Sequence, residues 1–250
     1  MAASTDQPQP LVAHLTELRD RLLKALLSVL VVFLCLFPFA NEIYTFVSEP
    51  LRAILPPGST MIATEVASPF LTPFKLTLFA ALFVAIPYVL FQIWSFIAPG
   101  MYRQEKRLAI PLLISSVLLF YAGAAFAYFV VFPLVFAFFT SVGPTDVAIM
   151  TDINRYLDFV LKLFFAFGLA FEIPIVALLL IWAGVTTRAA LKQKRPFIIV
   201  FCFVFGMLLT PPDIISQALL AIPMWLLFEV GLFFSQFVER DADSDTTPNE

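Results

Sequence analysis

Long, uninterrupted apolar runs constrain this chain more than any other feature. They are continuous rather than alternating, which is typical of transmembrane helices and not of barrel strands. Charged residues make up only 13% of the chain, about half the share of a soluble domain. The sequence therefore predicts an all-α integral membrane protein, a single polytopic domain over residues 1–250 with six spans at 22–39, 76–97, 110–139, 156–182, 196–209 and 214–238.

The fifth run is the shortest of the six. It extends from Pro196 to Leu209, and at ~1.5 Å per residue it would be roughly 21 Å long, against a hydrocarbon core of ~30 Å. Only the segment from Thr210 to Asp213 separates it from the sixth run, so the two are predicted to form a tight hairpin. Asp213 is expected to cap the sixth helix.

The distribution of Lys and Arg predicts the orientation of the chain. Cytoplasmic connections of helical membrane proteins carry an excess of these residues. The connections on one side contain Arg52 and Arg155. Eleven basic residues fall on the other side: Arg19, Arg21, Lys24, Arg103, Lys106, Arg107, Arg188, Lys192, Lys194, Arg195 and Arg240. Both termini are therefore expected in the cytoplasm.

The connection over residues 40–73 lies on the opposite, outer side. It is long and contains several turn-forming residues, among them Pro50 and the stretch Pro56-Pro57-Gly58. This predicts a cap folded over the outer face rather than a simple connector. The acidic tail, residues 241–250, is expected to be disordered. No features of a cleavable signal precede the first run, so the first helix is expected to direct insertion.

Two carboxylates stand among the basic residues on the cytoplasmic side. Glu17 precedes the first run, and Glu105 lies between the second and the third. A carboxylate gains nothing from the rule that favours its basic neighbours. Each acid by itself is most simply explained by pairing with a nearby base, as Glu17 would pair with Arg21 four residues on. Together they would suit a cationic ligand, because two carboxylates can accept two adjacent arginines bidentately.

Four ionisable residues that lie inside the runs are functional candidates by default, because they are costly at bilayer depth. Asp158 and Lys162 are four residues apart and can neutralise each other on one helix face. Glu172 is either a hydrogen-bonded carboxyl that satisfies the backbone freed by Pro174 or a polar element of a translocation path, and both interpretations stay open. Glu229, near the cytoplasmic end of its run, is assigned a structural role.

Sequence signatures of an enzyme are absent. The one histidine, His14, precedes the first run, which excludes zinc-peptidase motifs and a Ser–His protease within the membrane. No phosphate-binding loop or dinucleotide fingerprint occurs. The chain is therefore not expected to be an enzyme, to carry a metal or cofactor, or to bind nucleic acid.

Short motifs spread along the chain carry a family resemblance: His14–Leu22, Ser68–Phe70, Phe96–Glu105, Phe129–Pro133, Phe171–Pro174, Lys194–Pro196 and Leu209–Asp213. With them the chain resembles TatC, the polytopic core subunit of the twin-arginine protein translocase, in its enteric-type proteobacterial form. The resemblance implies a concave bundle with short fifth and sixth spans in the bacterial inner membrane. It also implies a receptor for folded export substrates that carry an Arg-Arg signal peptide.

The same resemblance implies roles for individual residues. Glu17 and Glu105 would contact the arginine pair, Arg19 and Phe96 would shape the same site, and Glu172 would be the family's intramembrane carboxylate. Residues of the outer cap would be Pro50, Met61, Ser68, Pro69 and Phe70. The surface for single-span TatA/TatB helices would contain Met207, Thr210 and Gln217. Transport would use the proton-motive force and a multi-subunit complex of several copies in membrane lipid.

Two other functions fit the composition. A proton-coupled small-solute transporter would use Asp158, Lys162 and Glu172 and give Glu17 and Glu105 no special role. A structural scaffold would bind no peptide at all.

Overall fold

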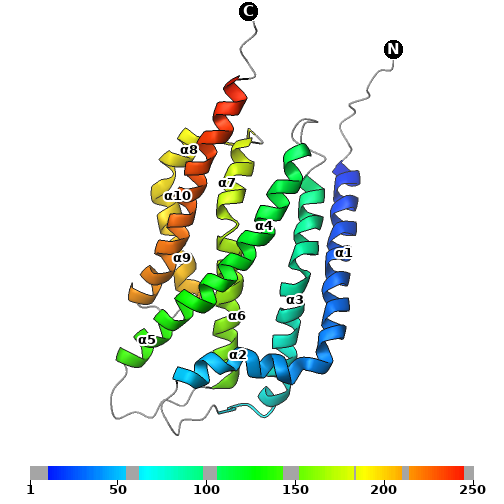
Figure 1. Ribbon diagram of the computed structural model, residues 1–250, viewed down its shortest axis with the longest axis vertical. Coiled ribbons are helices and arrows are strands. Elements are labelled where there is room, and N and C mark those ends of the chain that lie inside the picture. Colours follow the sequence, from blue (N-terminus) through cyan, green and yellow to red (C-terminus); the bar gives the residue numbers. More distant parts are fainter. Residues whose placement is uncertain are drawn as a thin grey trace, which may run out of the picture. The chain divides into compact units, whose positions relative to one another are not determined.

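The computed structural model describes residues 11–54, 62–97, 106–142, 152–182, 184–209 and 214–244, and its regular structure there is helical apart from one isolated bridge (Figure 1). Within these residues, five helical segments are long and apolar enough to cross a membrane: Leu15–Val47, Ser68–Phe96, Ile110–Val135, Ile153–Trp182 and Gln217–Gln236. A further apolar helix, Arg195–Leu209, is shorter. The prediction of an all-α, multi-pass membrane protein is confirmed. The sixth span and the side of the termini stay predictions.

Contacts divide the chain into two compact units, each described by itself. The first unit comprises Met1–Val47 and Pro73–Leu113, and the second comprises Ser48–Thr72 and Ile114–Glu250. That all spans form a single domain stays a prediction.

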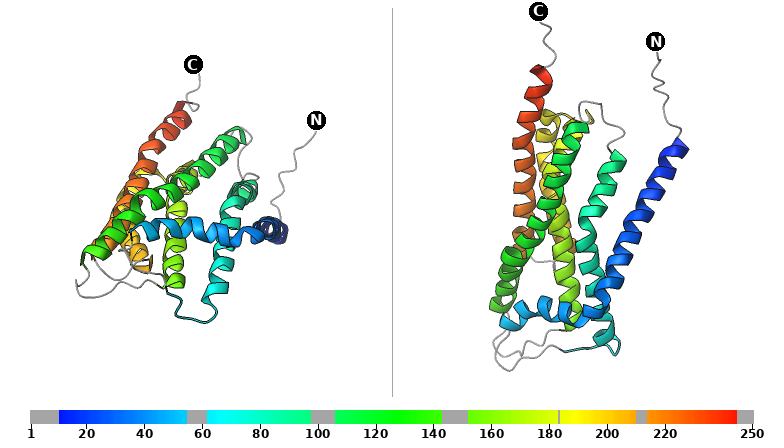
Figure 2. Two further views of the ribbon diagram at one scale, coloured as in Figure 1. Left: turned by 60° about the horizontal axis from the view of Figure 1, so that its bottom comes forward. Right: turned by 45° about the vertical axis from the view of Figure 1, so that its right-hand side comes forward.

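The first unit is built on two antiparallel helices, α1 (Leu11–Leu36) and α3 (Ser68–Ile97). Among the α1 side chains that the structure describes, only Phe33 is buried. Its ring packs edge-on against Phe74 of α3, with centroids 5.2 Å apart. Figures 1 and 2 show that the start of α1 and the end of α3 lie at the same end of this unit.

The connection over residues 40–73 is largely helical where the structure describes it. A short 3-10 segment, η1 (Phe37–Phe39), ends α1, and α2 (Ala40–Ile54) follows it, turning away from the axis of α1 (Figure 1). α3 then begins at Ser68 rather than at the predicted Leu76. Pro69 lies in the first turn of α3, where a backbone N–H has no intrahelical partner to lose, so it is compatible with this helix start. That the connection forms a cap over the outer face stays a prediction.

The second unit contains the rest of the helices. Their bounds are α4 (Lys106–Phe126, which begins in the first unit), η3 (Ala127–Val131), α5 (Phe132–Val142), α6 (Ile153–Ala170), α7 (Ile173–Trp182), α8 (Arg188–Gln193), α9 (Arg195–Leu209) and α10 (Ile214–Ser244). A buried cluster joins η3, α5, α6, α9 and α10 through residues that include Val131, Val135, Leu163, Phe167 and Leu220.

The third apolar run forms one continuous helix with a π-helical segment in its middle. Within it, η3 is followed directly by α5, and the backbone N–H of Phe132 donates to the carbonyl of Ala127. Pro133, the next residue, has no N–H to donate. The wider π turn therefore lets the helix continue past a proline that would otherwise interrupt it.

The sixth run is not short as a helix. α10 has 31 residues, which at ~1.5 Å per residue is roughly 46 Å. Pro223 lies inside it without ending it, as is common where neighbouring helices cover the freed backbone. The helix continues through Asp241–Ser244, part of the predicted disordered tail, because propagating an existing helix costs little. α9, with 15 residues, is short as predicted.

Candidate functional site

Glu17 lies in the second turn of α1 and is paired with an arginine of its own helix. Its Oε1 accepts hydrogen bonds from Arg21 Nη2 at 2.6 Å and Arg21 Nε at 2.9 Å. The Glu17 side chain is 29% exposed. The i,i+4 pairing predicted from the sequence is therefore present, and it leaves the carboxylate within reach of solvent.

Other predicted residues of this site lie in the same unit. Arg19 pairs with its neighbour Asp20 at 2.8 Å, and both side chains are exposed. Phe96 is half-buried next to the end of α3, at the same end of the unit as the start of α1 (Figure 2). Glu105 lies outside the described residues. The structure thus brings Glu17, Arg19 and Phe96 to one end of the first unit.

Glu172 lies in the turn between α6 and α7, where it accepts a hydrogen bond from a residue that the sequence analysis did not single out. The hydroxyl of Ser116, on α4, donates to Glu172 Oε2. Glu172 Oε1 is buried and has no partner among the described residues. The carboxyl is therefore hydrogen-bonded, as one of the two interpretations required, but to a side chain rather than to the backbone near Pro174.

Two glycines bring α4 and α6 close enough for this contact. A Cβ added at Gly123 would lie 2.4 Å from the carbonyl oxygen of Phe167, and one at Gly168 would lie 2.7 Å from the Phe120 ring. Phe120 is 1% exposed. Small residues at both faces allow the backbones to approach, as is typical of helix packing in membranes.

A second polar cluster, also missed, lies in the second unit at the start of α6. Ile62 and Asp152 form the isolated bridge, and Ile153 N–H donates to the Ile62 carbonyl at 2.9 Å. The Asp152 carboxylate caps α6 by accepting from the Asn154 and Arg155 N–H groups. It also accepts from the Thr64 hydroxyl at 2.6 Å.

These bonds favour the charged form of the carboxylate. The Thr64 hydroxyl, followed by the Arg155 backbone N–H, lowers the pKa of Asp152 to about 2. An Asp directly before an apolar helical run is an N-cap signal, so the cap could have been predicted, whereas the contact with Thr64 could not.

Most of the predicted cap residues lie on helices, and one lies outside the described residues. Pro50 is in α2, and Met61 lies outside the described residues. Ser68, Pro69 and Phe70 form the first turn of α3, where Ser68 is buried and Phe70 is exposed.

The predicted partner surface falls on α9 and α10. Gly206 of α9 approaches Gln217 of α10 so closely that an added Cβ would lie 3.3 Å from the Gln217 carbonyl oxygen. Met207, beside this contact, is 49% exposed. Thr210 and Asp213 lie outside the described residues, so the capping role of Asp213 stays a prediction.

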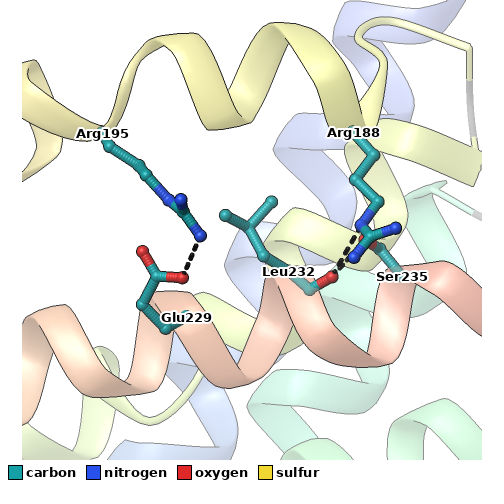
Figure 3. Close-up of polar contacts among 5 residues, drawn as sticks. All are labelled: Arg188, Arg195, Glu229, Leu232 and Ser235. Atoms are coloured by element: carbon teal, nitrogen blue, oxygen red, sulfur yellow. Dashed lines mark hydrogen bonds and ion pairs between the residues drawn. The ribbon is translucent and has the colours of Figure 1, made fainter.

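Two arginines tie α8 and α9 to α10 (Figure 3). Arg195 Nη2 lies 2.5 Å from Glu229 Oε2. Arg188 Nε donates to the carbonyl oxygen of Leu232 at 3.2 Å. Glu229 therefore has a charged partner within this unit, in agreement with the structural role expected of it.

Comparison with known proteins decides the family. The family profile described as Sec-independent protein translocase protein (TatC) matches residues 13–223. The chain belongs to the TatC family. The Sec-independent protein translocase protein TatC of Azotobacter chroococcum is 64% identical over 96% of this chain and 96% of that protein. Those of Haemophilus influenzae and Escherichia coli K12 are 56% and 57% identical, over 99% and 94% of this chain and 96% and 91% of theirs.

Solved structures of TatC agree with this fold. A crystal structure of the twin-arginine translocase receptor TatC superposes with a TM-score of 0.81 at 38% identity, over 90% of this chain and 98% of that one. A second, determined in DDM, superposes with a TM-score of 0.80 at 39% identity, over 89% and 99%. The resemblance to proteobacterial TatC is confirmed, and the small-solute transporter is not favoured.

Proposed function

We propose that this chain is the receptor and core subunit of a twin-arginine translocase in the bacterial inner membrane. It binds the Arg-Arg signal peptides of folded proteins at the cytoplasmic face through Glu17 and Glu105, with Arg19 and Phe96 beside them. With TatA/TatB-type subunits on the α9–α10 surface (Met207, Thr210 and Gln217), it exports these proteins at the expense of the proton-motive force. This is a binding and transport function, not an enzymatic one.

The structural observation that supports this proposal is that the Glu17 side chain stays 29% exposed and keeps Oε2 unused by Arg21, although its Oε1 pairs with that residue. A partly exposed carboxylate already accepts an arginine guanidinium there through both Nε and Nη2. An arginine of a signal peptide presents the same group to Glu17, whose other oxygen, Oε2, is not used by Arg21. Family membership supplies the second half of the support, because its crystal structures are of a twin-arginine translocase receptor.

Cross-linking of a signal peptide tests the receptor assignment. Membrane vesicles carrying the chain are mixed with a peptide that has a photoactivatable group beside its arginine pair. Glu17→Ala and Glu105→Ala are each expected to reduce cross-linking about tenfold or more, since each removes a hydrogen bond between charged groups. Glu42→Ala, at an exposed acid in the first turn of α2, is the matched control and should have no effect.

Undiminished cross-linking in both variants would show that the two acids do not receive the arginines. The transporter alternative makes the opposite prediction, because it requires uptake of a small solute by the purified chain alone. That uptake would have to depend on Asp158, Lys162 or Glu172 and be indifferent to Glu17→Ala.

A further inference from the structure

We propose that a groove between α9 and α10 binds an anionic phospholipid, with its headgroup on a basic elbow formed by Arg188, Lys192, Lys194 and Arg195. The groove has a volume of about 100 Å3 and is lined entirely by apolar side chains: Ile199, Cys202, Phe203, Ala221, Ile222 and Trp225. The proposal depends on the chain being a membrane protein and not on its role as a receptor.

Helix periodicity connects the groove to the elbow. On α9, Ile199 follows Arg195 by four residues, which places both on one face. On α10, Trp225 precedes Glu229 by four residues and shares its face in the same way. Since Arg195 and Glu229 are in contact at 2.5 Å, the apolar groove begins about one helical turn from this ion pair.

The elbow itself is held rigidly. Leu191 of α8 is 8% exposed and packs in a buried cluster with Ala177, Ile181, Phe228 and Leu232. The Thr187 hydroxyl caps α8 by accepting from the Ala190 N–H. With the contacts of Arg188 and Arg195 to α10 (Figure 3), these interactions fix the backbone on which the lysines stand.

The charge of the elbow is unbalanced. Glu229 neutralises Arg195, but Lys192 and Lys194 are exposed, and neither has an ion-pair partner among the described residues. Two buried donors on this face also have no acceptor within that part of the chain, Arg195 Nε and the Trp225 indole N–H. Cations and N–H donors beside an apolar groove match a ligand that offers anionic and carbonyl oxygens at the end of a hydrocarbon chain.

These features together favour a phospholipid over other occupants. A free phosphate would contact the lysines but leave the apolar groove unfilled. A zwitterionic lipid would fill the groove, but its headgroup carries no net negative charge to attract the lysines. Basic pockets between transmembrane helices are known to recognise anionic headgroups, and each Lys near an anionic surface is worth roughly fivefold in binding.

Tryptophan quenching tests the groove directly. The chain has three tryptophans, so Trp94→Phe and Trp182→Phe leave Trp225 as the only emitter. The full chain is placed in nanodiscs of phosphatidylcholine with a small mole fraction of brominated lipid. Brominated phosphatidylglycerol is expected to quench Trp225 with an apparent affinity at least about fivefold higher than brominated phosphatidylcholine.

Charge variants separate headgroup recognition from general attraction. Lys192→Gln with Lys194→Gln is expected to lower the preference for phosphatidylglycerol to less than about twofold, and replacing both by Arg should retain it. Lys24→Gln with Arg155→Gln removes equal charge from exposed side chains elsewhere and should leave the preference unchanged. Equal quenching by both brominated lipids would overturn the headgroup assignment. Absence of quenching by either would show that another helix, rather than lipid, covers the groove.

Discussion

The Ser116 hydroxyl of α4 donates a hydrogen bond to Glu172 Oε2, in the turn where α6 gives way to α7. The two residues are 56 positions apart in the sequence. The contact depends on the close approach of α4 to α6 at Gly123 and Gly168. A side chain at either glycine would push the two helices apart and separate Ser116 from Glu172.

Ser116→Ala is expected to lower the free energy of unfolding by about 1 kcal/mol, because Glu172 then loses its donor. Denaturant unfolding in detergent micelles measures it. Ser115→Ala, at the adjacent half-buried position, is the control. Equal effects of the two substitutions would mean that the hydrogen bond contributes nothing specific to stability.

Gly123→Ala is expected to destabilise the chain by about 1–3 kcal/mol, because the new methyl group would meet a backbone carbonyl at 2.4 Å. Gly206→Ala is the comparison, because its added Cβ would lie 3.3 Å from the Gln217 carbonyl oxygen, a close contact but a much less severe one. The same unfolding measurement ranks the two. A cost at Gly206 equal to that at Gly123 would contradict the proposed tight contact of α4 with α6.

The Arg195–Glu229 pair is expected to show a coupling energy of about 1 kcal/mol in a double-mutant cycle with Arg195→Gln and Glu229→Gln. The pair is only partly exposed, at 43% and 24%. The Arg19–Asp20 pair, 67% and 50% exposed, serves as the reference and should give nearly zero. A coupling no larger than this reference would show that the ion pair does not help to hold α9 against α10.

Acidification should release the contact between Thr64 and the start of α6. The pKa of Asp152 is lowered from its usual 3.8 to about 2, so its charged form stabilises the fold above pH ~4, and this contribution is lost as the pH falls towards ~2. Titration of the carboxyl carbon by NMR measures the pKa. Thr64→Val removes the hydroxyl donor and should move the pKa back towards 3.8, and an unchanged value would contradict the hydrogen bond.

Lengthening α9 by one apolar turn, about 6 Å, tests whether its short length serves transport. We hypothesise that the mismatch thins the adjacent lipid and helps recruited subunits to open a passage. Export of a folded substrate should fall while signal-peptide cross-linking is retained. The same insertion after Gln236 of α10, which already exceeds the bilayer, is the control. Normal export with the longer α9 would exclude thinning as the mechanism.

Continuous apolar runs were sufficient to predict the membrane class and most of the helices, because backbone hydrogen bonding in lipid leaves few alternatives. They were not sufficient for helix ends. The predicted span starts at Leu76, but α3 begins at Ser68 with Pro69 in its first turn, where a helix tolerates proline, and Pro223 lies inside α10 without ending it.

Contacts between residues close in sequence could be predicted, whereas contacts between distant residues could not. The Glu17–Arg21 pair follows from helix periodicity alone and was predicted. The partners of Glu172, Asp152 and Glu229 lie 56, 88 and 34 residues away, respectively. No local sequence rule pairs such distant residues, because their contact depends on how the helices pack. The sequence indicates only that a polar residue lies within or beside an apolar run and needs a partner.

The sparse burial of α1 has a mechanical consequence for recognition. Glu17 precedes Phe33 by sixteen residues, roughly 24 Å along the helix axis. At that distance from Phe33, a tilt of α1 by roughly 10° about the Phe33–Phe74 contact would move Glu17 by about 4 Å. If Glu17 is the proposed receptor acid, a tilt of this size would let it follow the arginine of a signal peptide while the Phe33–Phe74 contact stays in place.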